Sequence, residues 1–129
     1  MLSSLNNKLI ERLYSEIPEF KEFAEEYIFD IFQMDAYTIY GPFGSFLRDK
    51  MLENSGGNYL ISRGFNLINN LCDKKNDDIE QMLKSTFFEP LTDYKITIVE
   101  SQRFLTGKAK DLFNEVLTNS IFKGGKNSQ

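Results

Sequence analysis

One stretch of the chain, residues 58–72 (NYLISRGFNLINNLC), constrains the fold more than any other. Its apolar residues recur every three or four positions, which is the spacing of a helix. They cover more than half of the helix circumference, so such a helix has to be packed on several sides. We therefore expect residues 58–72 to form a central helix around which the rest of the chain is arranged. Cys72 lies on its apolar side, where a buried and unreactive thiol is expected.

Segments with helical spacing of apolar residues lie before and after this stretch, and each is polar on one face. Pro18 ends a first helix and suits the first position of a second one, because proline lacks the backbone N–H that a helix interior needs. Residues 54–57 (NSGG) end a third helix, and Glu89-Pro90 ends a fifth. The expected helices cover residues 2–17, 18–32, 43–52, 58–72, 77–87 and 107–121.

Two short segments do not read clearly as helices. Residues 37–40 (YTIY) are aromatic and β-branched and are followed by Gly41-Pro42, so we expect an extended segment in a loop. Residues 94–99 (YKITIV) alternate in a way that fits a strand, but no partner strand is evident. We therefore favour a helix over residues 95–105.

These patterns predict an all-α fold, a compact bundle of about six to seven short antiparallel helices whose pairing suggests a repeat-like arrangement. Its 129 residues suffice for one domain. We expect that domain to span residues 1–122, and the polar residues 123–129 to form a flexible tail. The N-terminus has no continuous apolar core of the signal-peptide kind, and no stretch reaches membrane-spanning length. We therefore expect a cytoplasmic protein.

The composition argues against most enzyme classes. The chain has no histidine and one cysteine, which removes histidine-dependent nucleophile systems and nearly all catalytic zinc sites. Catalysis by carboxylates alone is the remaining enzymatic alternative. The net charge of −4 disfavours binding to nucleic acid or to anionic membranes. We expect no enzymatic activity, no cofactor and no metal.

The most distinctive polar feature is an acidic run between Glu16 and Asp35, which holds seven acids and one base, Lys21. Spacings of three and four residues place several of these acids in one stripe along a helix. A solvated face that aids solubility is one interpretation, and a surface that meets a basic partner is the other. The candidate partner-binding residues are Glu19, Glu22, Glu25, Glu26, Asp30 and Asp35, with Tyr37 and Tyr40 as aromatic anchors. A second acidic cluster, Asp73, Asp77, Asp78 and Glu80, is better explained by helix capping.

Three stretches carry a resemblance: residues 40–48 (YGPFGSFLR), 79–91 (IEQMLKSTFFEPL) and 104–112 (FLTGKAKDL). Together with the helix between the first two, they resemble a family of small all-helical bacterial proteins that look like immunity proteins. Such proteins belong to toxin–immunity and contact-dependent growth inhibition systems. The resemblance implies a helical fold and a protein-binding role, and it supplies no catalytic residues.

The function expected from these observations is that of an immunity protein. It would bind a cognate bacterial toxin, in particular a basic nuclease domain, and cover its active site. The alternative is a regulatory or adaptor domain that binds another protein as a monomer or a homodimer.

Overall fold

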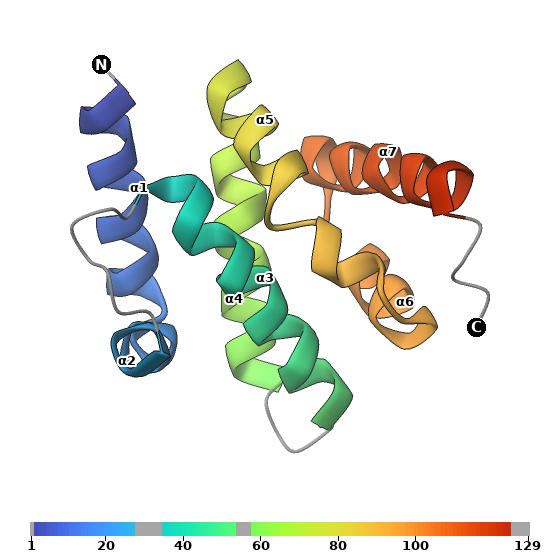
Figure 1. The fold of residues 1–129 in the computed structure, drawn as a ribbon, viewed down its shortest axis with the longest axis horizontal. Coiled ribbons are helices and arrows are strands. Elements are labelled where there is room, and N and C mark those ends of the chain that lie inside the picture. Colours follow the sequence, from blue (N-terminus) through green and yellow to red (C-terminus); the bar gives the residue numbers. More distant parts are fainter. Residues whose placement is uncertain (1, 28–34, 54–57, 125–129) are drawn as a thin grey trace.

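The computed structural model describes residues 2–27, 35–53 and 58–124. Within these ranges the chain forms α-helices and one 3-10 helix, and no strand, which confirms the all-α prediction. The elements in chain order are α1 (Leu2–Glu16), α2 (Pro18–Tyr27), α3 (Ala36–Glu53), α4 (Asn58–Asp73), α5 (Asp77–Ser85), η2 (Glu89–Thr92), α6 (Lys95–Phe104) and α7 (Gly107–Gly124). Figure 1 shows α3 and α4 in the middle, with α1 and α2 on one side and α6 and α7 on the other.

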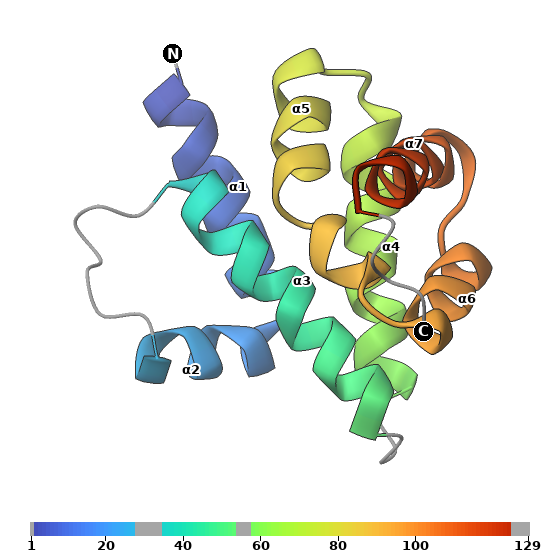
Figure 2. The same ribbon diagram turned by 45° about the vertical axis from the view of Figure 1, so that its right-hand side comes forward.

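Pro18 separates the first two helices as predicted. Ile17 closes α1 by donating its backbone N–H to the carbonyl of Leu13 at 2.8 Å. Its own carbonyl then accepts the amides of Phe20 and Lys21, so one residue serves both helix ends. Because Pro18 is the first residue of α2, its missing N–H removes no helical hydrogen bond. The chain turns sharply here, and Figure 2 shows α2 crossing the end of α1.

The prediction of an extended segment at residues 37–40 is wrong, because these residues form the first turns of α3. The buried positions Ala36, Ile39, Tyr40, Phe43 and Leu47 continue one helical stripe through the segment. Burial of this stripe outweighs the local preference of aromatic and β-branched residues for strands.

Gly41-Pro42 was expected to punctuate the chain but lies inside α3. A residue before proline is pushed out of the helical region chiefly by contacts of its own Cβ and N–H with the proline ring. Gly41 has no Cβ, so part of that restriction is absent. Pro42 costs one helical hydrogen bond, which the packing on both sides of α3 offsets.

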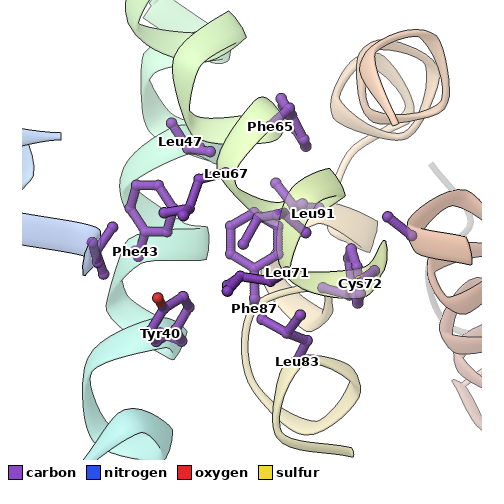
Figure 3. Close-up of a cluster of buried hydrophobic side chains, with 14 of the residues drawn as sticks. Tyr40, Phe43, Leu47, Phe65, Leu67, Leu71, Cys72, Leu83, Phe87 and Leu91 are labelled. Carbon is purple, nitrogen blue, oxygen red and sulfur yellow. The ribbon is translucent and has the colours of Figure 1, made fainter. Parts of the chain in front are cut away.

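The core lies between α3, α4 and the segment that follows α5. Figure 3 shows Phe43 and Leu47 of α3 facing Leu67 of α4, with Phe87 close to the middle of the cluster. The ring centroids of Phe43 and Phe87 are 5.4 Å apart, and Phe87 is fully buried. The predicted central helix, α4, is therefore confirmed as packed on several sides, and α3 shares its central position. Cys72 is buried as expected, and burial raises the pKa of its thiol to about 12.

Two glycines allow close packing in this core, one against a backbone and one against a side chain. A Cβ on Gly44 would lie 2.3 Å from the carbonyl oxygen of Phe87, so α3 and the segment after α5 touch through their main chains. A Cβ on Gly64 would lie 2.8 Å from a methyl group of Leu47, where α4 crosses α3. These contacts place α4 and the 87–92 region against the same side of α3.

The second half of the chain contains the predicted helices, but two of their boundaries differ. The last helix, α7, was expected to end at residue 121 and runs to Gly124. The segment 94–99 is helical, as favoured, and forms most of α6. The helix expected over residues 77–87 ends at Ser85, and the chain then passes through buried Phe87 and Phe88 into η2. Asn76 caps α5 by accepting the amide of Ile79 at 3.1 Å, and Asp77, Asp78 and Glu80 lie in the first turn. The prediction of a flexible tail over residues 123–129 is wrong at its start, because residues 123 and 124 belong to α7. The NSGG stop at residues 54–57 and the rest of that tail, residues 125–129, lie outside the described residues.

Candidate partner-binding surface

The acidic face of α2 is the candidate surface. Glu19, Glu22, Glu25 and Glu26 are all exposed, whereas Phe20 and Ala24 of the same helix are fully buried. Successive residues of a helix are about 100° apart around its axis. Glu19, Glu22 and Glu26 therefore fall in one stripe, and Glu25 lies on the opposite side of Glu22 from Glu19 and Glu26. Asp30, which would extend the stripe, lies outside the described residues.

Three of these carboxylates stand without an ion pair in the part of the chain that the structure describes. Glu22, Glu25 and Glu26 form no ion pair with any of the described residues. Lys21 is the one base on α2. The helix therefore presents a net negative potential to solvent.

Glu19 differs because it is held by Arg63 of α4. The guanidinium Nη2 of Arg63 donates to the Glu19 carboxylate at 2.5 Å, and Nη1 donates to the backbone carbonyl of Glu16 at 3.2 Å. The hydrogen bond from Arg63 holds the pKa of the Glu19 carboxyl below its usual value. Arg63 thus joins the end of α1, the start of α2 and the first half of α4.

Tyr59 belongs to this surface, although it is not among the residues predicted from the sequence. Its ring lies over the Arg63 guanidinium, 4.8 Å from centroid to Cζ, and 75% of the residue is exposed. Through Arg63 it stands next to Glu19 at the start of the acidic stripe. The signal in the sequence was the spacing of four between Tyr59 and Arg63, which places both on one face of the predicted helix.

Asp35, by contrast, serves the fold. Its Oδ1 accepts hydrogen bonds from the backbone N–H and the hydroxyl of Thr38, both at 2.9 Å. Its own carbonyl accepts the amide of Ile39 at 3.1 Å. Asp35 is the N-cap of α3, and its carboxylate satisfies an amide at the start of that helix. We therefore leave it out of the surface.

The prediction of Tyr40 as an exposed anchor is wrong. Tyr40 is fully buried, and its hydroxyl donates to the carbonyl of Leu9 at 2.8 Å, which ties α3 to α1. Burial raises the pKa of this phenol well above its ordinary value. The error follows from the misplaced loop, because only a helix directs Tyr40 toward the same core as Phe43.

Tyr37 is 47% exposed but stands apart from the acidic helix. It borders a small crevice of about 70 Å³ between α1, α3 and α5, whose other lining residues are Leu5, Asn6, Leu9, Ala36, Asp78 and Met82. Those α1 residues precede the turn at Pro18 by about two helical turns or more. The structure therefore does not bring Tyr37 and the α2 glutamates into one site.

The α2 surface is open to solvent and encloses no deep pocket among the described residues. Its open depression is lined by Pro18, Glu19, Lys21, Glu22 and Glu25.

Across the described residues, no three or more cysteine, aspartate or glutamate side chains are grouped so that they could hold a metal ion. None of the helices in the described part of the chain has the length and apolar character needed to cross a membrane.

Comparison with known proteins adds no relative to these observations. No protein family, no curated protein and no solved structure matches the chain.

Proposed function

We propose that this protein is a non-enzymatic immunity protein of the cytoplasm, which binds a basic bacterial toxin and covers its active site. A toxin nuclease is the partner class that fits best, because its substrate-binding groove is basic. The observation that carries the proposal is the set of exposed α2 carboxylates, Glu22, Glu25 and Glu26, that form no ion pair with the described residues. They follow Glu19 on the same helix, and Arg63 links Glu19 to the exposed ring of Tyr59.

The proposed contact divides into two parts. The α2 carboxylates would attract the toxin and set its orientation, since complementary charge accelerates association and selects partners. Tyr59 would supply the aromatic contact near the centre of the interface, where most of the binding free energy is usually concentrated. Arg63 would hold Glu19 and Tyr59 in place before binding, so that little ordering is required when the partner arrives.

A direct test is protection of bacteria against the product of the neighbouring gene, which the proposal requires to be a toxin. The variant Glu22→Lys/Glu26→Lys reverses two neighbouring charges of the stripe. Both side chains are exposed, so we expect the variant to keep the helical circular dichroism spectrum of the wild type. We expect it to lose protection and to bind the purified toxin at least about 100-fold more weakly.

The matched control is Asp73→Lys/Asp111→Lys, which changes the net charge by the same amount on other faces of the molecule. Both of these aspartates are exposed, one at the end of α4 and one on α7. The control should protect as well as the wild type. Full protection by the α2 variant would remove the acidic stripe from the proposal, and equal loss in both variants would mean that only net charge matters.

A further inference from the structure

Helix α6 is built with its polar residues inside and part of its apolar residues outside. Thr97 and Ser101 are fully buried, whereas Ile96 is 53% and Val99 is 55% exposed. A surface helix of a globular protein normally shows the reverse arrangement. The alternating residues that made this segment resemble a strand fall on different faces of the helix, so Ile96 is exposed whereas Ile98 packs against the core.

The fold explains the buried hydroxyls but not the exposed apolar residues. Thr97 donates to the carbonyls of Leu91 and Tyr94, both at 2.9 Å, and so fastens α6 to η2. Ser101 is small enough to pack against its neighbours, although its hydroxyl has no partner among the described residues. Nothing in these contacts requires Ile96 and Val99 to be apolar.

The outward face of α6 follows the pattern of a two-stranded coiled coil. Ile96, Val99 and Arg103 are separated by three and four residues, as at successive a, d and a positions of a heptad. In that register Lys95 is a g position and Glu100 an e position, on opposite flanks of the stripe. Within the chain the Glu100 carboxylate accepts a hydrogen bond from Arg103 at 2.9 Å, and a second copy would add Lys95 to this pair. Thr97 and Ser101 then fall at b and f, away from the stripe and toward the protein's own core.

We infer that this face binds the same face of a second copy of the chain, with the two α6 helices parallel around a two-fold axis. In a parallel pair a g residue lies beside the e residue five positions further along the partner helix. Lys95 of each copy would therefore meet Glu100 of the other. In an antiparallel pair the same flanks would oppose like charges, so the charge pattern selects the parallel arrangement.

The position of α6 favours self-association through this face. Figures 1 and 2 place α6 on the opposite side of α3 and α4 from the acidic helix α2. Two copies that meet through α6 keep their α2 surfaces apart, which limits repulsion between chains with a net charge of −4. This helix is only 10 residues long, so the contact is small and we expect a dissociation constant of about 10 to 100 µM.

Sedimentation velocity of the full chain, from about 5 to about 500 µM, tests the inference. The wild type should change from monomer to dimer across this range. Val99→Glu places a charge in the centre of the stripe and should remain a monomer throughout, with an unchanged helical circular dichroism spectrum because the side chain is exposed. A wild type that stays monomeric, or a dimer that Val99→Glu leaves intact, would overturn the inference.

A charge swap tests the parallel register itself. Lys95→Glu brings two acids together across the interface and should weaken the dimer about tenfold, and Glu100→Lys should do the same with two bases. The double variant Lys95→Glu/Glu100→Lys should recover an affinity close to that of the wild type. The matched control Lys110→Glu changes an exposed lysine on α7 and should leave the dimer unchanged. A double variant no tighter than the single variants would contradict the parallel pairing.

Discussion

The carboxylate of Glu19 on α2 and the guanidinium of Arg63 on α4 are hydrogen-bonded at 2.5 Å, although the two residues are 44 positions apart in the chain. Arg63 is only 24% exposed, whereas half of Glu19 remains accessible to water. The same guanidinium binds the last carbonyl of α1 and supports the ring of Tyr59. One side chain of the central helix therefore fixes where the acidic helix begins and where the exposed aromatic residue stands.

This pair makes the stability of the protein depend on pH in a defined direction. Arg63 holds the pKa of Glu19 below its ordinary value of 4.5, so the pair stabilises the fold above that pH. The contribution is lost as the pH falls through the lowered value, where the folded protein takes up the proton. Glu19→Gln should therefore lower the free energy of unfolding at pH 7 by up to about 1 kcal/mol, and by progressively less as the pH falls below the ordinary pKa of the carboxyl. Urea unfolding of both proteins across this range measures the difference.

Glu22→Gln is the matched control for this measurement. It removes an exposed carboxylate from the same helix that forms no ion pair with the described residues. Its effect on stability should be close to zero at neutral pH. A difference between wild type and Glu19→Gln that stayed constant from neutral to acid pH would contradict the assigned role of the ion pair.

The spacing of apolar residues predicted the fold well, because apolar residues that recur every three or four positions lie on the face of a helix that becomes buried. The apolar spacing in residues 58–72 correctly predicted a helix packed on several sides, and Pro18 correctly marked the boundary between two helices. The error at residues 37–40 arose where local composition and long-range packing disagreed. The sequence around Asp35 and Gly41 does not by itself indicate a helix. Asp35 acts as an N-cap, and Gly41 tolerates the following proline, only once α3 has formed.

The candidate site was predicted less well than the fold, for a physical reason. Charge along one helix can be read from spacing, so the exposed glutamates of α2 were identified correctly as a surface stripe. The partners of that stripe come from other helices, and their approach depends on tertiary packing. Tyr59 reaches the stripe through Arg63, while Tyr40 turns into the core and binds Leu9.

Tyr40→Phe should destabilise the protein although it removes a single oxygen atom. The hydroxyl donates to the carbonyl of Leu9 in a buried setting, so the change leaves that acceptor without this donor and without access to water. We expect a loss of about 1 to 2 kcal/mol in the free energy of unfolding, measured by chemical denaturation. Tyr37→Phe, at a half-exposed site, should change the stability by less than about 0.5 kcal/mol. Similar effects of the two variants would argue against the buried hydrogen bond.

Gly44→Ala should be among the most damaging small substitutions in the chain. Its new Cβ would approach the carbonyl oxygen of Phe87 to 2.3 Å, and a backbone atom in the core cannot move aside cheaply. We expect a loss of about 3 kcal/mol or more, visible as a lower thermal unfolding midpoint.

Gly107→Ala provides the comparison, because its Cβ meets nothing within 4 Å and its cost comes from a φ of +51° alone. That conformational cost should be about 1 to 2 kcal/mol. If the two alanine variants were equally stable, the close approach of α3 to Phe87 would be refuted.

Asn69 should control the connection between α6 and α7. Its Nδ2 donates to the carbonyl of Phe104 at 3.2 Å, and its Oδ1 accepts the amide of Thr106 at 3.0 Å. Asn69→Ala removes both hydrogen bonds, and we expect a loss of about 1 to 2 kcal/mol. Hydrogen exchange at the Thr106 amide should accelerate more than at the Ile79 amide, which the unrelated side chain of Asn76 protects. Equal acceleration at both amides would indicate global destabilisation and not the loss of a local clamp.

Tyr59→Ala separates binding from folding on the proposed toxin surface. The residue is 75% exposed and its ring rests on Arg63, so its removal should lower the stability by less than about 1 kcal/mol. As the aromatic centre of the interface it should contribute at least about 2 kcal/mol to binding, which is a roughly 30-fold weaker dissociation constant for the toxin. Tyr37→Ala removes an exposed tyrosine beside a crevice formed by other helices, and it should bind the toxin as the wild type does. Isothermal titration calorimetry of the three proteins decides between the two surfaces: a loss confined to Tyr37→Ala would move the contact from α2 and α4 to the crevice between α1, α3 and α5.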